Sequence, residues 1–254
     1  MLPVPDSTAE LRSGLSSALY ESLDPLRRAG VPLGILFSGG VDSSLLAWEL
    51  RETPGLVLCT LGREGSSDLE SGRVGAQQLG LPWQGLRAGE EEVKSAASRF
   101  EGPLAGLSSV ARTVLLTLAV AIVQARPRRL VCGQGADELF LGYAHYRGLG
   151  PEEARRRSDE DLERLRSVDW PRTRQIAIAC GKDIEAPFLS PEFEQSVRRI
   201  PIELRLPADL PKRFLREWAV ERGLPAALAY RPKKAVQYGT GVAGLLRGMR
   251  RSAH

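Results

Sequence analysis

The chain has 254 residues, a net charge of +4 and 43% hydrophobic residues, which suits one well-buried α/β core and excludes wholesale disorder. No apolar run approaches the roughly 18 residues that a membrane span needs, and the N-terminus lacks the features of a secretory signal, so we expect a cytoplasmic protein. The basic excess is scattered, which suits an anionic substrate and not a nucleic-acid partner. Three distant cysteines and two histidines make a disulfide framework or a zinc site improbable.

Apolar residues mark a succession of short strands and helices. Leucines between positions 11 and 26 recur at helical spacing and predict an opening helix. Further along, the pattern predicts strands at 33–37, 56–61, 83–86 and 129–132, and helices at about 68–79 and 110–123. We expect Asp68 to cap the helix that it begins. Strands that alternate with helices imply an α/β fold in which helices cover both faces of a parallel sheet.

The composition changes after Gly150. Residues 151–166 are almost all charged, and their spacing fits a solvated helix better than a nucleic-acid patch. The remainder looks helical, with turns marked by proline. We therefore expect one domain over 1–254, in which residues 30–150 form the α/β nucleotide-binding core and residues 151–254 form a helical extension that completes the active site.

A glycine-rich segment joins the first predicted strand to the next helix and reads Ser38-Gly39-Gly40-Val41-Asp42-Ser43-Ser44. Two adjacent glycines let the backbone turn sharply and bring N–H groups close to a ligand. The helix N-terminus adds N–H donors and partial positive charge, and the serines add hydroxyls. A plain strand-to-helix turn is the alternative, but Asp42 favours function: it would repel phosphate unless a cation lies between them, so it implies Mg²⁺. The predicted ATP and pyrophosphate ligands here are Ser38, Gly39, Gly40, Asp42 and Ser43.

This segment resembles the PP-loop of the ATP pyrophosphatase superfamily, whose pattern is SGGxDS. Three later segments resemble signatures of the asparagine synthetase family, in the family's order. Residues 133–143 (GQGADELFLGY) resemble GEGxDExFxGY, residues 183–190 (DIEAPFLS) resemble ExRxPFLD, and residues 230–234 (YRPKK) resemble the RxK segment. The resemblance implies a PP-loop fold of the adenine nucleotide alpha hydrolase type. It also implies ATP as a substrate, Mg²⁺, and a ligase reaction of amino-acid biosynthesis.

The resemblance assigns roles along the nucleotide. The backbone at the end of the second strand, Leu61 and Gly62, would hold adenine, and Gly133 would line the phosphate site. Asp137 would share Mg²⁺ with Asp42 and so neutralise the departing pyrophosphate. A helix N-cap is the structural alternative for Asp137.

Lys233 is a predicted catalytic and phosphate-binding residue. A mobile ammonium near the α-phosphate would stabilise the charge that develops in both transition states. Only the resemblance assigns this role to Lys233, because an isolated lysine is otherwise read as an ordinary surface residue. Its neighbour Lys234 is the alternative for the same role.

The signatures also depart from the family. Gln134 stands where the family has a glutamate, and an amide can orient a nucleophile but cannot act as a base near neutral pH. Asp183, Glu185 and Ser190 replace the Glu, Arg and final Asp of ExRxPFLD, so we expect an acceptor pocket that differs from the family's pocket for aspartate. We predict Gln134 and Asp183 as catalytic residues, with Glu138 and Glu185 as alternative proton acceptors.

The leading hypothesis is an AMP-forming carbon–nitrogen ligase. It would adenylate a carboxylate, aspartate or a related acid, release pyrophosphate and transfer the acyl group to ammonia or another amine. Leu2 stands where the family's glutaminase carries its catalytic cysteine, so we expect the amine from solution or from a separate glutaminase or amine-donor subunit. The alternatives are a nucleotide-binding protein with lost or altered chemistry and an RNA-modifying adenylating enzyme. We expect small-molecule substrates, and neither a nucleic-acid nor a membrane partner.

Overall fold

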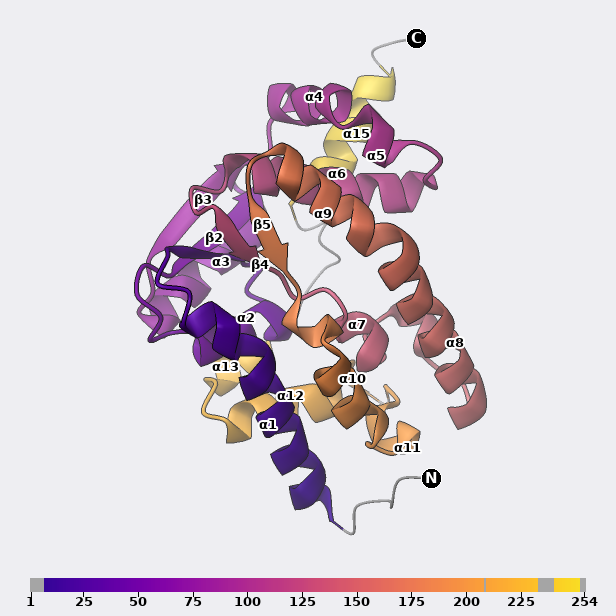
Figure 1. Ribbon diagram of the computed structural model, residues 1–254. Coiled ribbons are helices and arrows are strands. Elements are labelled where there is room, and N and C mark those ends of the chain that lie inside the picture. The colour runs from indigo at the N-terminus through magenta and orange to yellow at the C-terminus, as the bar shows by residue number, and fades with distance from the viewer. Residues whose placement is uncertain (1–6, 208, 233–239, 252–254) are drawn as a thin grey trace.

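A five-stranded parallel sheet with strand order β3-β2-β1-β4-β5 lies at the centre of the protein, and helices cover both of its faces (Figure 1). The structure is a computed structural model that describes residues 7–207, 209–232 and 240–251. The strands are β1 (Leu33–Leu36), β2 (Val57–Gly62), β3 (Trp83–Arg87), β4 (Arg129–Val131) and β5 (Asp183–Glu185). The expected α/β fold with a parallel sheet is thereby confirmed.

The helices fall into three stretches of the chain. The first stretch holds α1 (Thr8–Arg27), α2 (Val41–Glu49), α3 (Ser67–Leu79), α4 (Glu90–Arg99), α5 (Glu101–Leu104) and α6 (Ser109–Gln124). The second holds α7 (Ala136–Leu139), η1 (Ala144–Tyr146), α8 (Pro151–Arg164), the π-helical turn η2 (Leu165–Asp169) and α9 (Trp170–Ala179). The third holds η3 (Pro187–Leu189), α10 (Pro191–Arg198), α11 (Ile202–Arg205), α12 (Arg213–Glu221), α13 (Ala226–Ala229) and α15 (Val242–Arg251). Among the described residues, no helix is both long and apolar enough to cross a bilayer.

Side chains alternate between the two faces of the sheet and so divide the interior into two main cores. Ile35, Leu58 and Val131 join the core formed with α1, α2, α10 and α12. Cys59 and Leu130 point to the other face and join the core formed with α4, α6 and α9. A period of two residues is what a strand buried on both faces imposes. Cys59 and Cys132 are buried free thiols.

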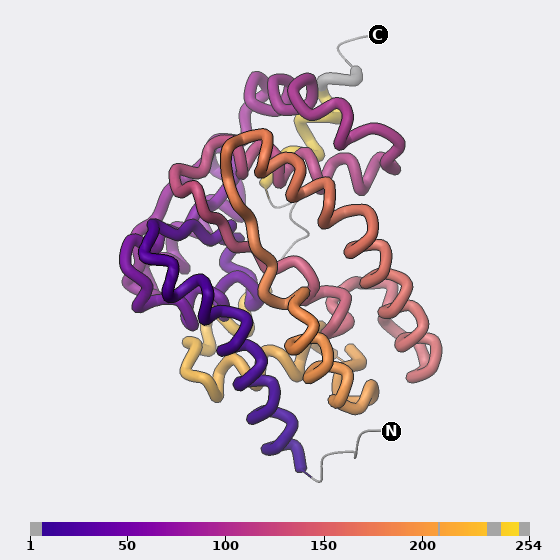
Figure 2. The backbone as a smooth tube through the Cα atoms, in the orientation of Figure 1, coloured from indigo at the N-terminus to yellow at the C-terminus, as the bar shows by residue number. Residues whose placement is uncertain are grey.

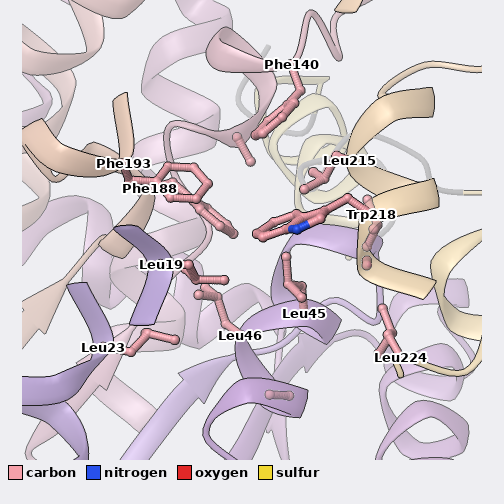
Figure 3. Packing of buried hydrophobic residues seen from close by; sticks show 14 of the residues in the cluster. Leu19, Leu23, Leu45, Leu46, Phe140, Phe188, Phe193, Leu215, Trp218 and Leu224 are labelled. Carbon is pink, nitrogen blue, oxygen red and sulfur yellow. The ribbon is translucent and has the colours of Figure 1, made fainter. Parts of the chain in front are cut away.

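The first core joins the N-terminal helix to segments from the second half of the chain. Figure 3 shows the Trp218 ring surrounded by leucines of α1 and α2 and by phenylalanines of the later segments. Polar contacts follow the same interface, since the Trp218 indole N–H donates to Ser16 Oγ at 3.2 Å. In Figure 2 the indigo N-terminal helix accordingly runs beside the orange segment that contains α10. The parts before and after residue 150 therefore share one core.

Two local expectations are corrected by the structure. Ser66, not Asp68, caps α3: its hydroxyl accepts the Leu69 N–H at 3.3 Å, while Asp68 lies in the first turn and is buried. The segment after residue 150 is not purely helical, because Asp183–Glu185 forms the fifth strand and pairs with β4. The sequence pattern did not reveal this strand because three residues carry too little periodicity. The charged helix over 151–166 is confirmed as α8 and the turn that follows it.

Candidate functional site

The glycine loop after β1 is shaped to receive an anion. Gly39 has a φ of +66°, which favours glycine, and a Cβ there would lie 3.1 Å from the Ser71 carbonyl oxygen. Gly40 is the N-cap of α2 and has no side chain to satisfy the first N–H groups of the helix. The hydroxyls of Ser38 and Ser43 lie 3.4 Å apart beside this helix end. Backbone donors and hydroxyls thus converge on one spot.

The loop after β4 packs directly against the first loop. A Cβ at Gly133 would lie 3.1 Å from the Cβ of Asp42, so the two turns touch. Gly135 has a φ of +96° and is the N-cap of α7, which carries Asp137 and Glu138. Because β1 and β4 are parallel neighbours, their carboxyl ends open at the same edge of the sheet, where ligands of such folds bind. The two loops thus lie together at one edge of the sheet.

Lys212 lies between the two predicted metal ligands. Its Nζ is 2.8 and 2.7 Å from the two carboxylate oxygens of Asp42 and 2.6 Å from Asp137 Oδ1. Lys212 and Asp42 are 5% and 4% exposed, so the pair is almost fully removed from water. A side chain at Gly142 would collide with both Asp137 and the Lys212 Cε, so that glycine makes room for the contact. Asp137 is therefore a partner of this lysine and not the cap of its helix.

The electrostatics explain why the Lys212 ammonium stays charged although it is buried. Burial lowers the pKa of the Lys212 ammonium, but the carboxylates of Asp137 and Asp42 raise it more, so the net shift is upward from its ordinary value. Two carboxylates that converge on one point repel each other, and the ammonium between them offsets that repulsion. Sequence patterns alone assigned Lys212 no role. One signal in the sequence points to a lysine. Two acidic ligands predicted at one spot call for a compensating positive charge, and the chain has only five lysines.

The carboxylates of Asp42 and Asp137 fit a Mg²⁺ ion that binds together with a nucleotide. Both acids reach a single point, marked here by the Lys212 ammonium. No group of three or more His, Cys, Asp or Glu side chains suited to a metal occurs in the described part of the chain. Mg²⁺ commonly binds through one or two carboxylates, with substrate phosphates and waters as its other ligands. Asp42 and Asp137 match the carboxylate part of that pattern, and the Lys212 ammonium occupies the point between them.

Glu138 forms a second buried acidic centre beside the first. It is 6% exposed, and its Oε1 accepts the Tyr143 hydroxyl at 2.6 Å. Burial, with a smaller contribution from neighbouring Asp137, raises the pKa of Glu138 to about 7. Glu138 thus exchanges a proton near neutral pH, which is the property of a general base.

The remaining predicted site residues lie on different segments, and the structure describes only some of them. Leu61 and Gly62 end β2 and are buried, and the next residue, Arg63, donates its N–H to the Thr240 carbonyl at 3.1 Å. Gln134 is half-buried in the Gly133 loop, and its Oε1 lies 3.6 Å from Cys132 Sγ. Lys233 and Lys234 lie outside the described residues.

Asp183 is not brought to the loops. It is exposed, and it pairs in register with Arg129, four positions before Gly133, or roughly 13 Å back along the strand direction. Glu185 bonds Arg129 across the strands at 2.6 Å. Both acids line a cavity of about 570 Å³ beside β5, together with Trp170, and none of its lining residues comes from the two glycine loops. Placement alone therefore argues against a catalytic role for Asp183.

The family model of asparagine synthase matches residues 14–175 and 148–254 of the chain. A Methanocaldococcus jannaschii protein, named as a putative glutamine-hydrolysing asparagine synthetase, is 30% identical over 274 aligned residues, which cover 92% of this chain and 50% of the relative. The glutamine-hydrolysing asparagine synthetase of Rattus norvegicus is 29% identical, and the match covers 90% of this chain and 43% of the relative. The chain thus spans about half or less of these curated relatives.

One solved structure resembles the chain at 12% identity and a TM-score of 0.38, the U34-tRNA thiolase NcsA of Methanococcus maripaludis. The match covers 94% of this chain and 80% of the thiolase. A likeness this low does not bear on function.

Proposed function

Because the chain belongs to the asparagine synthase family, we propose that it is an ATP-dependent ligase that adenylates a carboxylic acid and transfers the acyl group to an amine. The observation that carries the proposal is the meeting of two carboxylates and a buried lysine between two glycine loops. Such a site combines donors for phosphate oxygens with acids that hold a divalent cation. ATP and Mg²⁺ are the proposed substrate and metal.

In the first step, an oxygen of the acid attacks the α-phosphorus and the bond to the β-phosphate bridging oxygen breaks, which releases pyrophosphate. The N–H groups and hydroxyls of the glycine loop bind the phosphates. The Lys212 ammonium neutralises negative charge on them once it leaves the carboxylates. Asp42 and Asp137 would hold Mg²⁺, which would offset the charge of the leaving pyrophosphate. Lys233 is proposed to act at the α-phosphate.

In the second step, the amine nitrogen attacks the acyl carbon and the bond to AMP breaks. The amine loses a proton in this step. Glu138 is the candidate acceptor that the structure favours, since it is buried beside the loops and its pKa is about 7. Gln134 in the adjacent turn is proposed to orient the nucleophile. The amine is ammonia or another amine, supplied from solution or by a separate donor subunit.

Exchange of labelled pyrophosphate into ATP tests the first step. We expect exchange that depends on Mg²⁺ and on one acid from a panel of amino acids and related carboxylates. Asp42→Asn and Asp137→Asn should each abolish it, whereas Asp24→Asn, which changes a half-buried acid paired with Arg28 on α1, should not. ATP binding without exchange for any carboxylate would support the alternative of a nucleotide-binding protein and contradict the ligase.

A further inference from the structure

Arg231 holds two consecutive carbonyl groups of the glycine loop. Its Nε donates to the Gly39 carbonyl at 2.9 Å, and its Nη2 donates to the Ser38 carbonyl at 2.8 Å. The guanidinium comes from the segment after α13, more than 190 positions away in the sequence. It is half-buried, and its Cζ lies 3.5 Å from the position that a Cβ on Gly39 would occupy. The fork geometry of arginine suits two adjacent acceptors.

The direction of these carbonyls decides what the loop offers to a ligand. In a trans peptide the C=O and the following N–H point in opposite directions, and the described residues contain no cis peptide. With the Ser38 and Gly39 carbonyls turned towards Arg231, the N–H groups of Gly39 and Gly40 point away from it. A carbonyl that faced a phosphate would repel it, so a loop that binds anions must keep its oxygens outward.

Arg231 is itself supported by the segment that carries Lys212. Arg216 lies one helical turn beyond Lys212 on α12 and is 7% exposed. Its Nε donates to the Pro211 carbonyl at 2.8 Å, and its Nη1 donates to the Ala229 carbonyl. The same buried arginine thus ties the base of the Lys212 turn to the chain just before Arg231.

We propose that Arg231 is a positioning residue that keeps the carbonyls of Ser38 and Gly39 outward and so preorganises the loop's N–H groups for the phosphates. The proposal rests on the proposed function, because it assumes that phosphate binds at this loop. It assigns Arg231 no contact with the substrate.

The test compares Arg231→Ala and Arg231→Lys with wild type. Arg222→Ala is the matched control, because Arg222 also makes two bonds beside α2 but to Glu49, away from the loop. Calorimetric titration with inorganic pyrophosphate and Mg²⁺ should show affinity weakened roughly tenfold or more in Arg231→Ala, less in Arg231→Lys, and unchanged in Arg222→Ala. In ligand-free ¹³C-labelled protein, the carbonyl resonances of Ser38 and Gly39 should shift in Arg231→Ala and not in Arg222→Ala.

The outcomes separate the two ideas. Wild-type protein that does not bind pyrophosphate would overturn the proposed function. Wild-type protein that binds, together with an Arg231→Ala variant of equal affinity or unshifted carbonyl resonances, would overturn the role of Arg231 alone. Should Arg231→Ala fail to fold, Arg231→Lys decides, because it keeps the charge and loses the rigid planar fork that reaches both carbonyls.

Discussion

Lys212 and Asp42 form a buried ion pair in which one ammonium nitrogen lies 2.7 and 2.8 Å from both oxygens of the carboxylate. The same nitrogen also bonds Asp137, so one cation serves two acids. When one partner of a buried pair is removed, the other is left with an uncompensated charge. The free protein therefore depends on this lysine for stability, and the phosphate chemistry proposed above requires it to change partners.

Lys212→Met should destabilise the protein by about 3–5 kcal/mol at neutral pH in the absence of divalent cations, because two close carboxylates then lack their counter-charge. Mg²⁺ should restore part of that loss in the variant, since the two acids can share the ion. Urea unfolding with and without Mg²⁺ measures both effects. Arg213→Met is the control, because the neighbouring Arg213 is exposed and pairs with Glu217 one turn along α12. Equal stability of Lys212→Met and wild type would contradict the prediction.

Glu138 should make stability depend on pH in a defined window. Its pKa rises from an ordinary value of 4.5 to about 7 in the folded protein, so the folded state keeps a proton that the unfolded state has lost. The favourable contribution of the protonated form is complete below pH 4.5 and is lost as the pH rises through about 7. Glu138→Gln cannot ionise and still accepts the Tyr143 hydroxyl, so the variant should gain stability relative to wild type between pH 5 and 8, by roughly 3 kcal/mol at most.

Urea unfolding at a series of pH values measures this gain. Glu163→Gln, an exposed change on α8, should leave the profile unaltered. If the free energy of unfolding changes with pH in the same way for Glu138→Gln and wild type, Glu138 is ionised over the whole range and the prediction is wrong.

Gln134→Glu should raise ammonia-dependent amide formation if the site is otherwise of the asparagine synthetase type. A carboxylate at position 134 would add a second proton acceptor to the proposed acceptor Glu138, which an amide cannot do. Mass spectrometry of the product from both forms is the measurement, with pyrophosphate exchange as the control for an intact first step. Efficient asparagine synthesis from aspartate and ammonia by the unmodified protein would show that no base is needed at this position.

Lys233→Ala should lower turnover by roughly a hundredfold or more while ATP affinity stays within an order of magnitude, because charge on the transition state is what the ammonium stabilises. Steady-state kinetics together with ATP titration separates the two effects. Lys234→Ala is the neighbouring control. A silent Lys233→Ala with a strong loss in Lys234→Ala would move the role by one residue.

The sequence by itself determined the local parts of the site. The strand, glycine turn and helix around Ser38 follow from apolar runs, adjacent glycines and the start of a helix, all close together along the chain. The same holds for the turn at Gly133. Since parallel strands end at one edge of their sheet, the meeting of the two turns also follows from the order of strands and helices in the sequence.

Only the tertiary structure decided which charges complete the site. Lys212 reaches Asp42 across 170 positions, and Arg231 reaches Gly39 across 192, with no motif spacing that links them. The register of a three-residue strand likewise placed Asp183 far from the loops. The physical reason is that helix and strand periodicity reports which face of an element is buried, whereas the energy of a charge pair depends on distance in space and on removal from water. For Lys212, the distance to Asp42 and the removal of the pair from water are set by the packing of α12 against α2 and not by any local pattern.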